Sequence, residues 1–269
     1  MALQRLIAIL LINGLLGGRA LATELPAISI IIDDLGYQLN AGKQAVDLPG
    51  NLTFAFLPYS PYARLLAERA NQSHKEVMLH LPMQSDNGKR LGPGGLTMTQ
   101  DEQSFKQTLH DSLSSVPHVR GFNNHMGSYL TRNRNMMRWL MQSAMFRTDL
   151  YFVDSRTTAD SLAEEEAIRH GIAATRRDIF LDYENDGAIV KQQLEKLIRQ
   201  AREKGTAVAI GHPYPQTLAV LTNWLPTLRH KGIRLVPVST LIRLRQPERI
   251  PAWQMSSYPS HRAVKNLKR

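Results

Sequence analysis

The chain has 269 residues, of which 43% are hydrophobic and 21% charged, and a formal net charge of +10. This composition favours an ordinary globular protein with a sizeable core, in one α/β domain or two small ones. The absence of cysteine excludes a fold held together by disulfides. A basic surface favours anionic glycans, anionic lipid or the cell wall as partners, with nucleic acid as the alternative.

Residues 1–22 have the pattern of a secretory signal peptide. Arg5 precedes the apolar stretch LIAILLINGLLGG, and the small-residue sequence ALA at 20–22 ends that stretch. We expect export to a bacterial periplasm, which argues against nucleic acid, and no stable membrane span after cleavage. The alternative is an uncleaved anchor: the stretch is shorter than the roughly 20 residues that span a bilayer, but Arg19 is atypical so close to a cleavage site.

Short β-rich runs alternate with segments of helical spacing along the rest of the chain. This alternation predicts βα units and a parallel sheet, open or closed into a barrel. We expect one domain over residues 23–247 and a basic tail over 248–269. The predicted strands are 27–32, 52–57, 76–81, 150–153, 178–182, 206–211 and 233–238, and the predicted helices are 61–71, 101–113, 135–144, 188–205 and 217–232.

Polar, titratable residues stand where several of the predicted strands end. Asp33 and Asp34 follow the first run, His80 lies near the end of the third, Asp154 follows 150–153, and His212 follows 206–211. Parallel α/β folds carry their functional groups at the carboxyl ends of the strands. The sequence therefore predicts a site built from these side chains.

Each of these residues also has a structural interpretation. Asp33, Asp34 and Gly36 match ordinary turn chemistry, and His80 has the apolar neighbours of a core histidine. Two adjacent carboxylates repel each other, however, and a metal together with one catalytic base would compensate for that repulsion.

Two further segments present polar side chains from irregular sequence. GFNNHMGS at 121–128 has neither helix nor strand character, so we expect a sharp turn that exposes Asn123, Asn124 and His125, or a turn held by its own asparagines. GHPYPQT at 211–217 predicts a rigid loop that either positions His212 for acid or base chemistry or forms a structural corner.

One aspartate and two histidines suit Zn²⁺ or another divalent ion with positions open for water and substrate. The close-spaced metal motifs are absent, so such a site would be assembled from distant segments. The G-x-S-x-G elbow, the P-loop and the Rossmann glycine pattern are also absent, which argues against a serine hydrolase and a nucleotide cofactor.

Five segments in order resemble the divergent polysaccharide deacetylases, the YibQ-like branch of the NodB-type carbohydrate esterases. They are IIIDDLGY, LTFAFLPYSPYARLLAERA with EVMLHLPMQ, GFNNHMGSYLT, YFVDSRTT and AIGHPYPQTL. The resemblance implies a deformed (β/α) barrel of the polysaccharide deacetylase (glycoside hydrolase/deacetylase) type. It also implies a divalent metal, most often Zn²⁺, and removal of N- or O-acetyl groups from a cell-envelope or other polysaccharide, such as a peptidoglycan-like glycan.

The resemblance assigns a metal-binding role to Asp34 and His80. The family's second histidine falls at position 84, where this chain has Gln84, and His125 would supply the third ligand from a different loop. The broken histidine pair favours a second hypothesis, a catalytically degenerate glycan-binding or envelope-assembly protein on the same fold. A metal-dependent hydrolase of another bond is a third.

The same resemblance makes Asp33 the catalytic base and His212 the general acid, with Asp154 as the carboxylate that orients His212. The family's arginine beside the base has no clear match, and Arg156 is its nearest candidate. The predicted substrate-binding residues are Asn123, Asn124 and Arg156.

Overall fold

The computed structural model describes residues 25–147 and 149–246. The predicted signal peptide at 1–22 and basic tail at 248–269 lie outside these residues. No helix in the described part of the chain is both long and apolar enough to cross a membrane.

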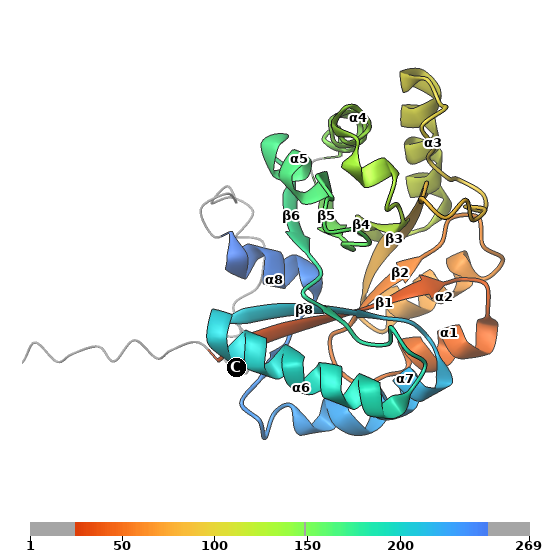
Figure 1. Ribbon diagram of the computed structural model, residues 1–269. Coiled ribbons are helices and arrows are strands. Elements are labelled where there is room, and N and C mark those ends of the chain that lie inside the picture. The colour runs from red at the N-terminus through yellow and green to blue at the C-terminus, as the bar shows by residue number, and fades with distance from the viewer. Residues whose placement is uncertain (1–24, 148, 247–269) are drawn as a thin grey trace, which may run out of the picture.

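The described residues contain nine β-strands in one sheet, and each of its strand pairs is parallel (Figure 1). The order across the sheet is β6-β5-β4-β3-β2-β1-β8-β7, and β9 pairs with β1. The strands are β1 (Ala27–Leu35), β2 (Thr53–Phe56), β3 (Glu76–Met83), β4 (Val119–Met126), β5 (Tyr151–Asp154), β6 (Ala173–Arg176), β7 (Ile179–Phe180), β8 (Thr206–Gly211) and β9 (Arg234–Leu235).

Helices lie around the outside of the curved sheet, as Figure 1 shows for α3, α4 and α5 on one side and α6 and α7 on another. The fold is therefore the deformed (β/α) barrel that the sequence predicts. The helices are α1 (Leu39–Val46), α2 (Ala63–Gln72), α3 (Glu102–Ser115), α4 (Arg134–Ala144), α5 (Ala163–Arg169), α6 (Gly187–Lys204), α7 (Pro215–Trp224) and α8 (Val238–Arg245), with 3₁₀ turns η1 (Leu130–Arg132) and η2 (Leu225–Thr227).

The core has two layers because successive strand residues face opposite sides of the sheet. The larger layer lies between the sheet and the outer helices. The smaller layer fills the barrel interior with residues such as Ile31, Met78 and Val208, and α8 closes it with Val238 and Leu241.

Helix α8 closes the amino-terminal end of the barrel. The Ser239 amide donates to Oε1 of Glu76, the first residue of β3, and the Val238 amide donates to Oγ1 of Thr53, the first residue of β2. The apolar plug and these hydrogen bonds occupy one end of the barrel, so the carboxyl-terminal end is left for the functional groups.

Several elements differ from the sequence-based expectation. Strands β4 and β6 and helices α1, α5 and α8 were not predicted, and the run 233–238 divides into β9 and the start of α8. The predicted helix 217–232 ends at Trp224, because Pro226 has no amide hydrogen and its ring crowds the preceding turn. Strand β4 was read as a turn because asparagine is a poor strand former.

Candidate active site

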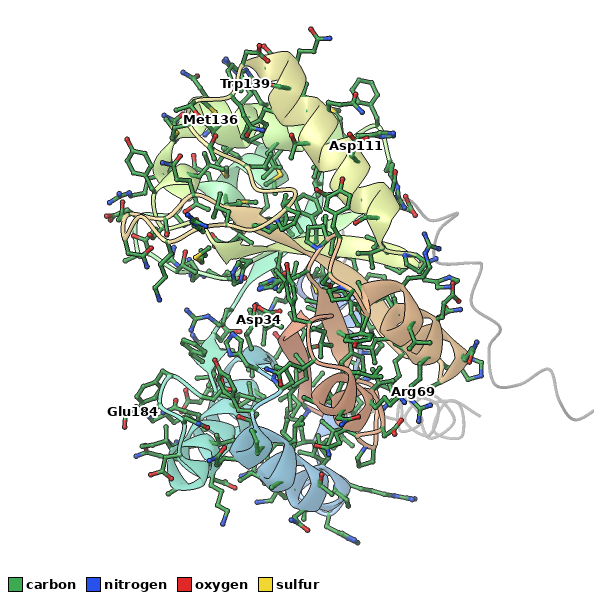
Figure 2. All side chains as sticks on the ribbon, turned by 90° about the vertical axis from the view of Figure 1, so that its right-hand side faces the viewer. Asp34, Arg69, Asp111, Met136, Trp139 and Glu184 are labelled. Atoms are coloured by element: carbon green, nitrogen blue, oxygen red, sulfur yellow. The ribbon has the colours of Figure 1, made fainter. Side chains whose placement is uncertain are left out.

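Asp33 and Asp34 reach the same place because β1 is irregular at its end. In a regular strand, neighbouring side chains would point to opposite faces of the sheet. Here the β1–β2 register shifts between Ile32 and Leu35, and Asp34 has a left-handed backbone with φ of 58°. Both carboxylates therefore face the barrel mouth, and Asp34 lies near the middle of Figure 2, between the half that carries α3 and the half that carries α7.

Asn123 links the first carboxylate to a histidine two strands away. Its Nδ2 donates to both oxygens of Asp33, at 2.9 and 3.1 Å, and its Oδ1 accepts from Nδ1 of His80 at 2.7 Å. His80 and Asn123 are direct neighbours in the β3–β4 register. Because Nδ1 of His80 donates in this bond, Nε2 is the ring nitrogen that can bind a metal ion.

Asp34, His80 and His125 form a triangle of ligand atoms. Asp34 Oδ1 lies 3.1 Å from His80 Nε2 and 3.0 Å from His125 Nδ1, and the two ring nitrogens lie 3.1 Å apart. Asp34 Oδ1 is buried and accepts no well-formed hydrogen bond. One carboxylate oxygen and two imidazole nitrogens at this spacing fit a divalent metal ion.

Gln84 lies outside this triangle and has a structural role. Its side-chain Oε1 accepts from the Met98 amide at 2.8 Å, while its main chain pairs with Leu96 and accepts from the Tyr129 and Leu130 amides. The residue that breaks the family's histidine pair thus anchors the neighbouring loops, and His125 stands beside Asp34 and His80 instead.

His212 faces the triangle from the other side of β1. Its Nδ1 lies 2.9 Å from Oδ1 of Asp182, whose Oδ2 accepts from the His212 amide at 2.7 Å and from Thr217 Oγ1 at 2.8 Å. Its Nε2 lies 3.8 Å from Oδ2 of Asp34. Asp182 therefore fixes the ring so that Nε2 points toward the site.

The prediction that Asp154 orients His212 is wrong. Tyr151 and Val153 of β5 face the barrel interior, so Asp154, the next residue, points to the opposite side. Its Oδ1 accepts from the Arg156 amide at 2.8 Å and its Oδ2 from Ser161 Oγ at 2.7 Å. The sequence analysis does not single out Asp182, although it is the last residue of the predicted strand 178–182.

The prediction that Asn123 and Asn124 contact substrate is also wrong, because both are buried. Asn124 Nδ2 donates to the Met126 carbonyl, and its Oδ1 accepts from the Ser155 amide. They are the interior polar groups of a strand rather than an exposed turn. Arg156 is half-buried with φ of 51°, and its contact with substrate stays a prediction.

Asn123 also replaces the expected arginine beside the base. In the described residues the guanidinium of Arg156 makes no hydrogen bond to Asp33. Arg177 contributes positive charge near Asp33, while its Nε and Nη2 donate to the carbonyls of Ser155 and Arg156. Asp33 is thus held by an amide and influenced by a cation that does not touch it.

Burial and charge set the protonation of the site. Burial raises the pKa of Asp33 above its ordinary value. Burial acts in the same direction on Asp34, but the adjacent His125 and His80 hold its pKa well below the ordinary range. Burial disfavours the charged form of His80, yet Asp33 and Asp34 raise its pKa to about 9. Burial also disfavours the charged form of His212, but the hydrogen bond and negative charge of Asp182 outweigh it and raise the pKa of His212.

The parallel barrel thus carries a carboxylate and two histidines at its mouth, flanked by a second aspartate and a third histidine. The family described as divergent polysaccharide deacetylase matches residues 30–242. The chain belongs to this family.

Individual proteins are also similar to this chain in sequence or in fold. The uncharacterized protein YibQ of Escherichia coli K12 is 35% identical over 215 residues, which cover 80% of this chain and 67% of YibQ. An uncharacterized protein of Agrobacterium tumefaciens C58 has a solved structure with a TM-score of 0.78 and 23% identity, covering 82% of this chain and 90% of that chain. The peptidoglycan deacetylase PdaC of Bacillus subtilis matches with a TM-score of 0.53 and 12% identity, over 84% and 94% of the two chains, which shows a shared fold.

Proposed function

We propose that this protein is an exported, zinc-dependent hydrolase that removes acetyl groups from a cell-envelope polysaccharide. The observation that carries the proposal is the triangle of Asp34, His80 and His125 with Asp33 and His212 beside it. Membership of the divergent polysaccharide deacetylase family supports a glycan substrate. The donor set of one oxygen and two imidazole nitrogens supports zinc, because catalytic zinc sites use imidazole and carboxylate ligands and keep a position open for water or substrate.

A divalent ion held by Asp34, His80 and His125 would act as a Lewis acid on the acyl carbonyl and lower the pKa of a bound water. Asp33 accepts the proton of the attacking water as the new bond to the acyl carbon forms. Its raised pKa suits this role, since a base is most effective when its pKa approaches the working pH.

His212 completes the reaction on the leaving-group side. Its Nε2 carries the proton to the departing amine nitrogen or alkoxide oxygen as the bond to the acyl carbon breaks, so the products are acetate and the freed sugar group. Asp182 at Nδ1 keeps the ring oriented and supports its protonated form. Base and acid thus act from opposite sides of the triangle.

Two features motivate the catalytically degenerate alternative: the arginine beside the base has no clear match, and position 84 is Gln84. That residue lies outside the triangle, and His125 gives the set a third ligand without it. The geometry therefore favours turnover over a binding protein that has lost it.

The test joins metal content to product release. Elemental mass spectrometry of the purified protein is expected to give about one zinc per chain, lost in both His80→Ala and His125→Ala. Acetate release from acetylated glycan fragments is expected to fall at least a hundredfold, roughly, in Asp33→Asn and His212→Ala. His110→Ala, on the exposed face of α3, is the control and should match the wild type.

Unchanged acetate release in both Asp33→Asn and His212→Ala would refute the mechanism. A protein that takes up no metal even after reconstitution would refute the zinc proposal.

We further propose a periplasmic location, supported by the signal-like pattern of residues 1–22. Cell fractionation of the full chain beside a chain lacking these residues tests this. Equal recovery of both from the cytoplasm would overturn it.

A further inference from the structure

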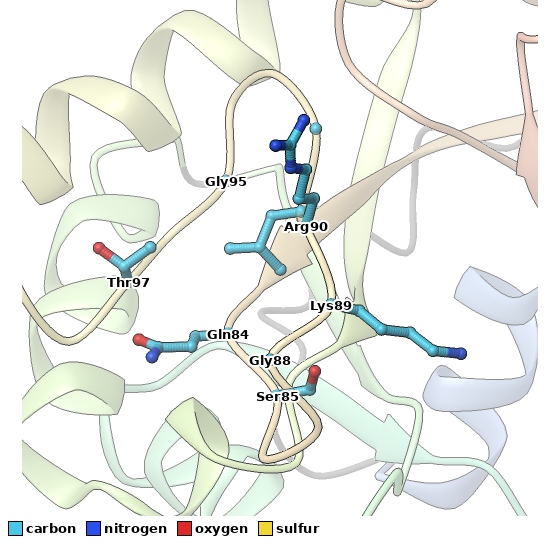
Figure 3. A pocket seen from close by; sticks show the side chains of 9 residues that line it. Gln84, Ser85, Gly88, Lys89, Arg90, Gly95 and Thr97 are labelled. Atoms are coloured by element: carbon cyan, nitrogen blue, oxygen red, sulfur yellow. The ribbon is translucent and has the colours of Figure 1, made fainter.

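The connection between β3 and α3 forms a loop held closed at its base. The Gln84 amide donates to the Leu96 carbonyl and the Leu96 amide to the Pro82 carbonyl, each at 2.9 Å. Gln84 Oε1 adds a third tie, to the Met98 amide. The segment from Ser85 to Gly95 therefore projects from a fixed base at the barrel mouth, and Figure 3 shows Lys89 and Arg90 extending from it in different directions.

This loop closes one side of a hollow that lies beside His125, one of the three residues of the triangle. The hollow has a volume of about 240 Å³, and His125 lies in its wall. Leu57, Pro58 and Pro82 form apolar parts of the wall, and Tyr37 adds an exposed aromatic ring. A space of this size is below the range of whole small-molecule pockets and suits one substituent of a larger ligand.

Arg90 supplies the cationic group in the wall of this hollow. Its side chain is exposed, and among residues 25–147 and 149–246 its guanidinium has no ion pair or hydrogen bond. The nearest acid along the loop, Asp86, is already paired with Arg132. A guanidinium without a partner suits a carboxylate ligand, because its planar group can donate two parallel hydrogen bonds to the two carboxylate oxygens.

Lys89 differs from Arg90 in its placement. It lies in the same loop and is equally exposed, but it lines a neighbouring hollow of about 360 Å³ that does not include His125. Arg90 contributes to both hollows. The two adjacent cations therefore provide a matched comparison: both carry one positive charge, and one of them faces the space next to the metal ligand.

We propose that Arg90 is a specificity-determining residue that binds a carboxylate carried by the acetylated glycan, next to the sugar whose acetyl group reacts. The proposal rests on the proposed function for the identity of the ligand as a glycan. It narrows the substrate class from polysaccharides in general to acidic ones. The carboxylate belongs either to a carboxyalkyl ether on an amino sugar or to a uronic acid. Both sources present the same carboxylate to the hollow.

Calorimetric binding to the metal-free protein tests the proposal without requiring turnover. The probes are N,N′-diacetylchitobiose, the disaccharide that adds a lactyl ether to it, and a disaccharide of N-acetylglucosamine and glucuronic acid. At least one acidic probe is expected to bind about ten- to a hundredfold more tightly than the neutral one. This difference in affinity should shrink at high salt. Arg90→Gln should abolish this preference and Arg90→Lys retain part of it, while Lys89→Gln keeps it.

Equal affinity for neutral and acidic probes, undetectable binding of both acidic probes at millimolar concentration, or equal effects of Arg90→Gln and Lys89→Gln would each overturn the inference. Acetate release by the metal-loaded protein distinguishes a failure of the Arg90 proposal from a failure of the proposed function. Release of acetate from all probes at equal rates retains the deacetylase and removes the role of Arg90. Binding through Arg90 without any acetate release retains that role and removes the deacetylase.

Discussion

Replacing Asn123 by leucine should weaken metal binding although Asn123 is not itself a ligand. Leucine is close to asparagine in shape, so the change removes the amide with little change in volume. It eliminates the two donor contacts to Asp33 and the acceptor for His80 Nδ1. His80 then loses the bond that keeps its Nε2 lone pair on the metal side.

The loss expected for such an outer partner is ten- to a hundredfold in affinity, or about 1.4 to 2.7 kcal/mol. The Asp33 carboxylate also loses its donor while buried, so its pKa should rise further. Zinc affinity is measured by competition with a chromophoric chelator at fixed pH, after circular dichroism has shown that the variant is folded.

Thr217→Val is the matched control for this experiment. Thr217 is also a buried polar residue near the site, but it donates to Asp182 and not to a metal ligand. This variant should retain wild-type zinc affinity and lose activity. A folded Asn123→Leu variant that binds zinc as tightly as the wild type would refute the assignment of Asn123 as the group that orients His80.

Other changes test separate parts of the structure. Asp182→Asn removes the charge that raises the pKa of His212, so His212 should lose its proton at lower pH. The alkaline limb of the pH–activity profile should therefore shift to lower pH, and a limb that does not shift would contradict this. Gln84→Ala should lower the free energy of unfolding in urea by about 1 kcal/mol and leave zinc affinity unchanged. A loss of zinc affinity would show that position 84 is a ligand. Gly36→Ala should destabilise by more than about 2 kcal/mol, because φ is +122° and a Cβ would lie 1.8 Å from Ser60 Oγ; a loss near zero would be incompatible with that contact.

The sequence predicts much of this site because its central groups follow apolar strands. That position makes Asp33, Asp34, His80 and His212 candidates, and the family resemblance assigns their roles. A parallel sheet brings such residues to one end of the barrel whatever their separation along the chain. The alternation of strands and helices predicts a parallel sheet, open or closed, and the family resemblance implies the deformed barrel.

The errors arise where the sequence does not reveal strand register. Asp154 ends a strand as Asp33 does, but it lies on the outward-facing side of β5, and only pairing with its neighbours shows this. Asp182 ends the predicted strand 178–182, but the sequence does not show that this strand lies beside β8 and so places Asp182 next to His212. Asn123 was taken for a turn residue, since a buried amide in a strand is favourable only when its partners, here Asp33 and His80, are in place.

The position of β1 between β2 and β8 has a consequence for how the protein folds. Ala27 pairs with Thr206, and Ile32 pairs with Gly211. The strand that bears both carboxylates therefore remains unpaired on one side until about four-fifths of the chain has been synthesised. Contacts of such long sequence separation form slowly, because loop closure must precede them. We expect the barrel mouth to be among the last parts of the molecule to assemble. A chain interrupted before residue 206 would contain Asp34, His80 and His125 but would lack His212, strands β8 and β9, and helices α7 and α8.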